Sequence, residues 1–167
     1  MPVSATVSAG IVANHTGAHD LGTPFVKVET SRRTFDFVNG VTAGKADRVF
    51  GDRRQLTASA SENLDLAGGL TDAFGASLTF VKVVAIAIKA ADTNAGDIIV
   101  GGAATNAFVG PFGAATHTIA VKPGGALTFV APQGGWTVTP ATGDLLKVAN
   151  AAASAAEYEV VILGTSA

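Results

Sequence analysis

The sequence predicts an all-β fold, a β-sandwich or jelly-roll-like domain, and leaves open an extended N-terminal arm. Three observations favour this fold class. Apolar and polar residues alternate with a period of two along most of the chain, as in half-buried strands. Turn sequences rich in Gly, Pro, Asn and Asp separate these runs at roughly the 8 to 12 residues typical of sandwiches and barrels. Helical periodicity is weak throughout.

The first strands are predicted in the N-terminal quarter. Residues 3–12 alternate with small apolar side chains on one face. Two further alternating runs occupy 25–30 and 33–38, and in the second of them Phe35 and Phe37 point to the same side. Because alternation places every second side chain on one face of a sheet, each run is expected to bury one side only.

The strongest strand is predicted at 78–90, where both faces are mostly apolar. Such a strand lies between two layers or at the centre of a sandwich. A weaker strand precedes it at 56–66, and 150–158 is interpreted as a loop before the last strand. Shorter runs are predicted at 98–100, 106–109, 117–122, 126–131, 136–139, 145–149 and 157–163.

The amino-acid composition excludes several kinds of site and suggests one class of protein. The 167 residues include no cysteine, which excludes disulfides, Cys-based zinc sites and thiol catalysis. Charged residues make up 14%, against a usual quarter or so. Low charge favours a protein that covers its surface in an assembly, because soluble monomers usually keep charged surfaces. The alternative is a small β domain with Ala- and Gly-rich loops.

Charge and hydropathy also argue against several partners. The net charge of −2 is unlike that of a nucleic-acid binder, which needs a basic face. The longest apolar run, at 78–88, is far shorter than the ~20 residues that span a bilayer, so no membrane partner is expected. The N-terminus lacks the basic start and apolar core of a secretory signal.

The basic residues are unevenly distributed, and seven of the eleven precede residue 56. They are Lys27, Arg32, Arg33, Lys45, Arg48, Arg53 and Arg54. One interpretation is an arm with strands at 1–55 that contacts neighbouring subunits, attached to a sandwich at 56–167. The other is one continuous domain in which early strands pair with late ones.

The segment KADRVFGDRR (45–54) is the densest charge cluster and the candidate interface site. Arg48, Arg53 and Arg54 alternate with aspartates, and the planar guanidinium group suits carboxylates across an interface. Phe50, in the middle of the segment, is expected to anchor the contact as an aromatic hot spot. The alternative is a solvated loop whose charges neutralise each other.

No set of residues predicts catalysis, a metal or a cofactor. His15 and His19 are four residues apart, but Gly17 and the turn residues around it argue against the helix that such a metal pair needs. DTNAGD (92–97) departs from a calcium loop at the fifth and sixth positions and is better explained as a turn. Since no nucleophile, base and orienting group occur together, we expect a protein that is not an enzyme.

The C-terminal two-thirds resembles a known group of proteins. The resemblance is carried by ADRVFGDRRQLTASASENLDLAGGLTDAFGASLTFVKV (46–83), NAFVGPFG (106–113), VKPGGALTFVAP (121–132), WTVTPATGDLLKVAN (136–150) and YEVVILGTSA (158–167). These segments are similar to small β-rich proteins encoded in the structural gene blocks of tailed bacteriophages and prophages. The likeness is a pattern of strands and turns, without a catalytic signature.

The resemblance implies a virion structural protein, foremost a head decoration or cement protein. Such a protein would bind the major capsid protein of the HK97 type and itself, as a homotrimer, and stabilise the capsid from its outer surface after assembly in the host cytoplasm. One alternative is a tail, neck or fibre-associated structural protein. Another is a carbohydrate-binding module. Its planar aromatic platform would depend on Trp136 and Tyr158, which are the only Trp and Tyr of the chain.

Overall fold

The computed structural model describes residues 2–18, 20–23 and 25–167 and confirms the all-β fold. Its strands are β1 (Ser4–Thr16), β2 (Phe25–Val38), β3 (Arg48–Leu56), β4 (Ser61–Asp65), β5 (Leu70–Thr71), β6 (Ser77–Leu78), β7 (Lys82–Ala90), β8 (Ile98–Gly101), β9 (Thr118–Val121), β10 (Ala126–Val130), β11 (Trp136–Thr137), β12 (Leu145–Asn150) and β13 (Ala156–Thr165). A helix with the length and hydropathy of a membrane span is absent from the described ranges.

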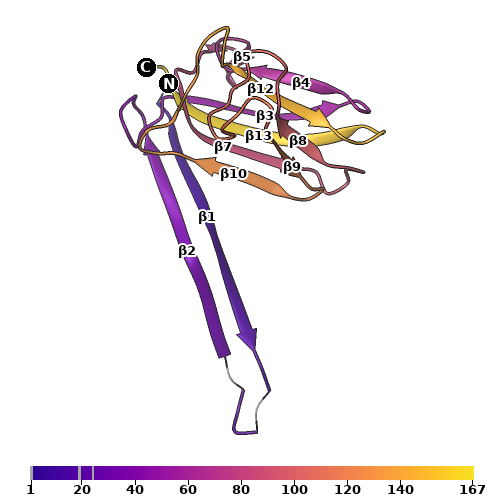
Figure 1. The fold of residues 1–167 in the computed structure, drawn as a ribbon. Coiled ribbons are helices and arrows are strands. Elements are labelled where there is room, and N and C mark those ends of the chain that lie inside the picture. Colours follow the sequence, from indigo (N-terminus) through magenta and orange to yellow (C-terminus); the bar gives the residue numbers. More distant parts are fainter. Residues whose placement is uncertain (1, 19, 24) are drawn as a thin grey trace.

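Two antiparallel sheets stack into the sandwich of Figure 1. The arm-side sheet has the order β10-β7-β13-β3, with β11 pairing with β7, and the far sheet has the order β4-β12-β8-β9. The main core fills the space between the sheets with aromatic and branched side chains such as Phe80, Ile86, Leu146, Tyr158 and Ile162. Alternation therefore gives each sheet one apolar inner face.

Strand β7 is covered on both faces, as its sequence predicts, although it begins at Lys82 and not at residue 78. Ile86 and Ile88 point into the main core, whereas Val84 and Ala85 belong to a second cluster on the outer side of the arm-side sheet. The loop predicted at 150–158 is shorter and covers 151–155, because Asn150 ends β12 and residues 156–158 already belong to β13. The run at 106–109 is a correction: it forms no strand but a single bridge, at Ala107, and the chain turns there through a positive φ of 51° at Asn106.

Strands β1 and β2 form a long hairpin, here called the arm, which projects from the sandwich (Figure 1). Its base packs on the outer side of the arm-side sheet, in the second cluster. That cluster combines Val3, Ala5, Val7, Phe35 and Phe37 with Val84, Ala85, Val130 and Leu163. The opposite face of the base is polar, since Thr6 Oγ1 donates to Asp36 Oδ1 at 2.8 Å. The base is thus a third layer on the sandwich.

A β-bulge lies halfway along the arm, between the pairs Ala9–Arg33 and Ile11–Thr30, where β2 carries one extra residue. Such a bulge shifts the alternation of the longer strand by one residue. Val26 and Val28 therefore share a face with Phe35 and Phe37, although the first two have even residue numbers and the last two odd ones. Gly10 lies opposite the bulge, and a Cβ there would stand 2.7 Å from the Cα of Arg32.

The arm ends earlier than the predicted segment 1–55. Strand β3 belongs to the sandwich, where it pairs with β13 from Arg48–Gly164 to Leu56–Ala156. This pairing of an early strand with the last one corresponds to the one-domain interpretation, while β1 and β2 form the arm. The basic composition of 1–55 reflects two different structural parts and marks no boundary at residue 55.

Candidate interaction surface

The three predicted interface arginines lie on β3 and each contacts a carboxylate of the same chain. Arg48 Nη1 is 3.2 Å from Asp47 Oδ2. On the outer face of the sheet, Arg53 Nη2 is 2.6 Å from Glu159 Oε1, and this hydrogen bond lowers the pKa of Glu159. The carboxylates that the sequence suggests a partner would supply are therefore present within the subunit, and exposed pairs of this kind contribute little stability.

Phe50 does not lie at the surface, which corrects its assignment as an interface anchor. Its side chain is 4% exposed and belongs to the main core, opposite Ile162 of β13. Strand alternation explains the difference, because Phe50 and Leu56 point inward while Val49 and Arg53 point outward. The charges around Phe50 suggested a loop and obscured this period of two.

Arg54 takes part in a polar cluster that joins the two sheets. Glu62, on β4 of the far sheet, accepts hydrogen bonds from Arg54 Nε at 2.8 Å and Nη2 at 2.5 Å. The other carboxylate oxygen accepts the hydroxyl of Tyr158, on β13, at 2.9 Å. Arg54 also reaches Asp52 at 2.8 Å. The cluster therefore links β3 and β13 to β4 at the side of the sandwich.

Burial and the hydrogen bond to Glu62 raise the pKa of Tyr158 above its ordinary value of about 10. At pH values below about 10, Tyr158 keeps its proton in both the folded and the unfolded chain. The burial and hydrogen bond of the neutral side chain then contribute fully to stability. At higher pH the unfolded chain loses the proton first, so we expect stability to fall as pH rises above about 10.

The measurement is urea unfolding at about pH 8 and about pH 11, together with the near-ultraviolet absorbance of tyrosinate, which reports Tyr158 alone because the chain has one tyrosine. Tyr158→Phe is expected to lose less stability between these pH values than the wild type. An equal loss in both proteins would contradict the assignment.

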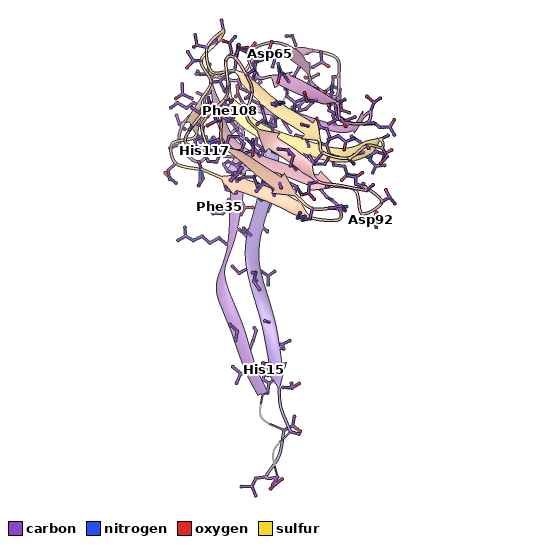
Figure 2. All side chains as sticks on the ribbon, turned by 45° about the vertical axis from the view of Figure 1, so that its right-hand side comes forward. His15, Phe35, Asp65, Asp92, Phe108 and His117 are labelled. Carbon is purple, nitrogen blue, oxygen red and sulfur yellow. The ribbon has the colours of Figure 1, made fainter. Side chains whose placement is uncertain are left out.

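The other residues weighed from sequence occupy turns and the arm. His15 lies toward the far end of the arm (Figure 2), and its predicted companion His19 lies outside the described residues. In the 92–97 turn, Asn94 exchanges two hydrogen bonds of 2.8 Å with the backbone of Glu157. No group of three or more potential metal-binding His, Cys, Asp or Glu residues occurs in the described ranges.

The far half of the arm presents an exposed apolar surface that sequence reasoning missed. Val26 and Val28 are 57% and 50% exposed, and the register places them on the same face as Ala13 and Ile11. These four residues are called the distal stripe. The sequence contains an indication of this surface. The valines have even residue numbers (26 and 28) and the phenylalanines odd ones (35 and 37), so they share a face only if a bulge lies between them.

A second exposed surface lies on the outer side of the arm-side sheet. The register aligns Gly51, Val161, Ala87 and Thr128 across all four strands, and these residues are called the outer row. Val161 is 44% exposed. The neighbouring row toward the arm contains Leu163, Ala85 and Val130, which the arm base covers. The outer row thus continues a surface that already binds part of the arm.

Comparison of the chain with protein-family models, with curated proteins and with solved structures gave no match.

Proposed function

We propose that this chain is a virion structural protein of a tailed bacteriophage, a capsid decoration protein that reinforces the lattice of the major capsid protein. The observation that carries the proposal is the arm. A two-stranded hairpin is marginally stable by itself in water, and the far half of this one exposes valines on the face whose near half packs in the second cluster. Such a segment is suited to insertion between other subunits.

The remaining surface is consistent with a structural role. The sandwich has its own hydrophobic core, while the arm extends away from it (Figure 1). A decoration protein requires this division, because it folds first and then attaches to a preassembled shell. Many copies on a lattice gain avidity even when each arm contributes a weak contact.

The carbohydrate-binding alternative finds less support. Sandwich modules bind sugars on exposed aromatic rings, but Tyr158 is buried in the core. Trp136 is half-buried, and its ring meets that of Phe129 edge to face at 6.2 Å between centroids. Neither residue presents an open aromatic platform. A tail, neck or fibre position uses the same arm and is separated from head decoration by the experiment below.

The test compares the full chain with a variant whose arm is shortened. Joining Ala9 to Arg33 through Asn-Gly preserves a paired position and supplies a favourable two-residue hairpin turn. This variant retains Val3, Val7, Phe35 and Phe37 of the second cluster, so we expect an unfolding midpoint close to that of the full chain. It is expected to lose binding to expanded empty heads of the phage, measured by co-sedimentation.

Two outcomes would contradict the proposal. Equal binding of heads by both proteins would remove the arm from the mechanism, and absence of binding by the full chain would remove head decoration altogether. The number of copies per virion separates the remaining structural roles. Hundreds of copies that dissociate from the head indicate decoration, whereas a few copies that remain with isolated tails indicate a neck or tip component.

A further inference from the structure

The distal stripe lies on the same face of the arm as the packed residues of its base, and the pair Ala9–Arg33 separates the two groups. Through the bulge, one face of the arm carries Val7 and Phe35 near the sandwich and Ala13 and Val28 farther out. The near residues lie on the outer side of the arm-side sheet. The far residues have the same chemistry and the same strand geometry, but they extend past the edge of the sandwich (Figure 1).

The direction of the arm carries this face past one edge of the sandwich. The beginning of the arm, at Pro2–Ala5, lines a groove with Val49 and Gly51 of edge strand β3. The base cluster reaches Val130 of the opposite edge strand, β10. The arm therefore crosses the sheet from one edge toward the other and leaves the sandwich near β10 (Figure 1). A second molecule beside β10 would offer its own outer face to the distal stripe.

The outer row is shaped to receive such a hairpin. Its side chains are small or branched, and Gly51 and Ala87 allow a close backbone approach on either side of Val161. On one side it borders the row covered by the molecule's own arm, and on the other it borders the charged row of Arg53, Glu159 and Lys89. An incoming hairpin would thus lie beside the resident arm base and extend the same third layer.

We propose that the distal stripe of one subunit docks on the outer row of a second copy of this chain. This arm exchange builds on the proposed function, because it names the partner of the arm within the assembly. Both surfaces adjoin a packing interface that the subunit already forms internally between the arm base and the arm-side sheet. The contact is heterologous, so repetition closes into a ring or continues as an open chain.

The available area predicts how strong the exchange is. The far half of the arm is roughly 20–25 Å long at about 3.4 Å per residue, and two strands are about 10 Å wide. One face therefore offers roughly 200–250 Å², against about 800 Å² per partner in a standard interface. In a closed ring each copy both donates and receives an arm, so the contact area per copy is twice this value. We expect an oligomer that dissociates on dilution.

Cross-linking in trans tests the exchange, and the absence of native cysteine gives a clean background. Val28→Cys and a size-tagged Val161→Cys are purified separately, mixed and treated with a mild oxidant. A mixed disulfide between the two chains is expected, because both positions are exposed and would face each other. Asn14→Cys is the matched control, since the register places it on the opposite face of the same hairpin.

Each outcome of the cross-linking experiment either supports or overturns arm exchange. A mixed band with Val28→Cys and little with Asn14→Cys supports arm exchange. Disulfides mainly between two Val28→Cys chains would overturn it in favour of arm-to-arm packing, and equal bands with both variants would indicate random collision. An absence of mixed disulfide at concentrations where the protein is oligomeric would also overturn it.

Solution mass gives an independent readout. Val26→Asp with Val28→Asp is expected to raise the concentration for half-dissociation by about a hundredfold in sedimentation runs, since buried interface charges are costly, whereas Asn14→Asp leaves it near the wild-type value. Unchanged association of the double variant, or a monomeric wild type at every concentration, would overturn the exchange. Because neither measurement uses capsids, a protein that binds heads without arm exchange would retain the proposed function and lose only this inference.

Discussion

Phe80→Ala is expected to lower the free energy of unfolding by about 3–5 kcal/mol, the usual range for a buried Phe truncated to Ala. Phe80 is almost fully buried in the main core just before β7. Its ring lies so close to β13 that a Cβ on Gly164 would stand 2.5 Å from the ring carbon Cδ1. Removing the ring leaves a cavity between strands that are fixed by their pairing, so little of the space can close.

The matched control is Phe74→Ala. Phe74 is 74% exposed in the turn between β5 and β6, so the same chemical change there is expected to alter stability very little. Urea unfolding measures both variants, and the fluorescence of Trp136, the single tryptophan, follows the transition. Similar midpoints for the two variants would contradict the assignment of Phe80 to the core, and a loss with Phe74→Ala would place that residue in an intermolecular contact.

Glu62→Ala is expected to lower the free energy of unfolding by about 2 kcal/mol. The change removes the acceptor of the buried Tyr158 hydroxyl and leaves Arg54 with only Asp52, and unpaired buried donors are costly. Arg54 and Glu62 are partly exposed, with side-chain exposures of 32% and 21%, so solvent screening keeps the value below that of a fully buried pair. Urea unfolding at neutral pH is the measurement.

Two comparisons separate this cluster from ordinary surface charge. Glu159→Ala breaks the exposed pair with Arg53 and is expected to have only a small effect. A double-mutant cycle between Glu62→Ala and Tyr158→Phe is expected to show coupling, because both changes remove the same hydrogen bond. Additive effects of the two changes, or equal losses from Glu62→Ala and Glu159→Ala, would contradict a role for Glu62 in joining the sheets.

The residues that stabilise the fold and the residues proposed to mediate association lie in different parts of the molecule. The core around Phe80 and the cluster around Glu62 hold the sandwich together from within. The distal stripe and the outer row lie outside this core, on the arm and on the outer face of the arm-side sheet. Changes in the second group are therefore expected to affect assembly while the unfolding midpoint stays nearly constant.

Much of the local structure follows from the sequence. Alternation predicts most of the strands, and the apolar character of both faces predicts that β7 lies between two layers. Alternation also contains the orientation of Phe50, which is buried in register with Leu56, although its charged neighbours suggested an exposed anchor. Where a run of only four residues, such as Asn-Ala-Phe-Val at 106–109, carries one buried phenylalanine, alternation is too short to distinguish a strand from a loop.

The sequence by itself determined the fold class, most strand positions and the lack of charge that suggests an assembly, because these depend on the period and composition of neighbouring residues. Only the tertiary structure decided that Arg53 meets Glu159, that Arg54 and Tyr158 meet at Glu62, and that the arm is free of the sandwich beyond its base. Those contacts depend on which strands pair across long separations, such as β3 with β13, and on a bulge that shifts the phase of β2 by one residue. Local alternation specifies which side of a strand is apolar, but the partner that covers that side is set by the packing of the whole chain.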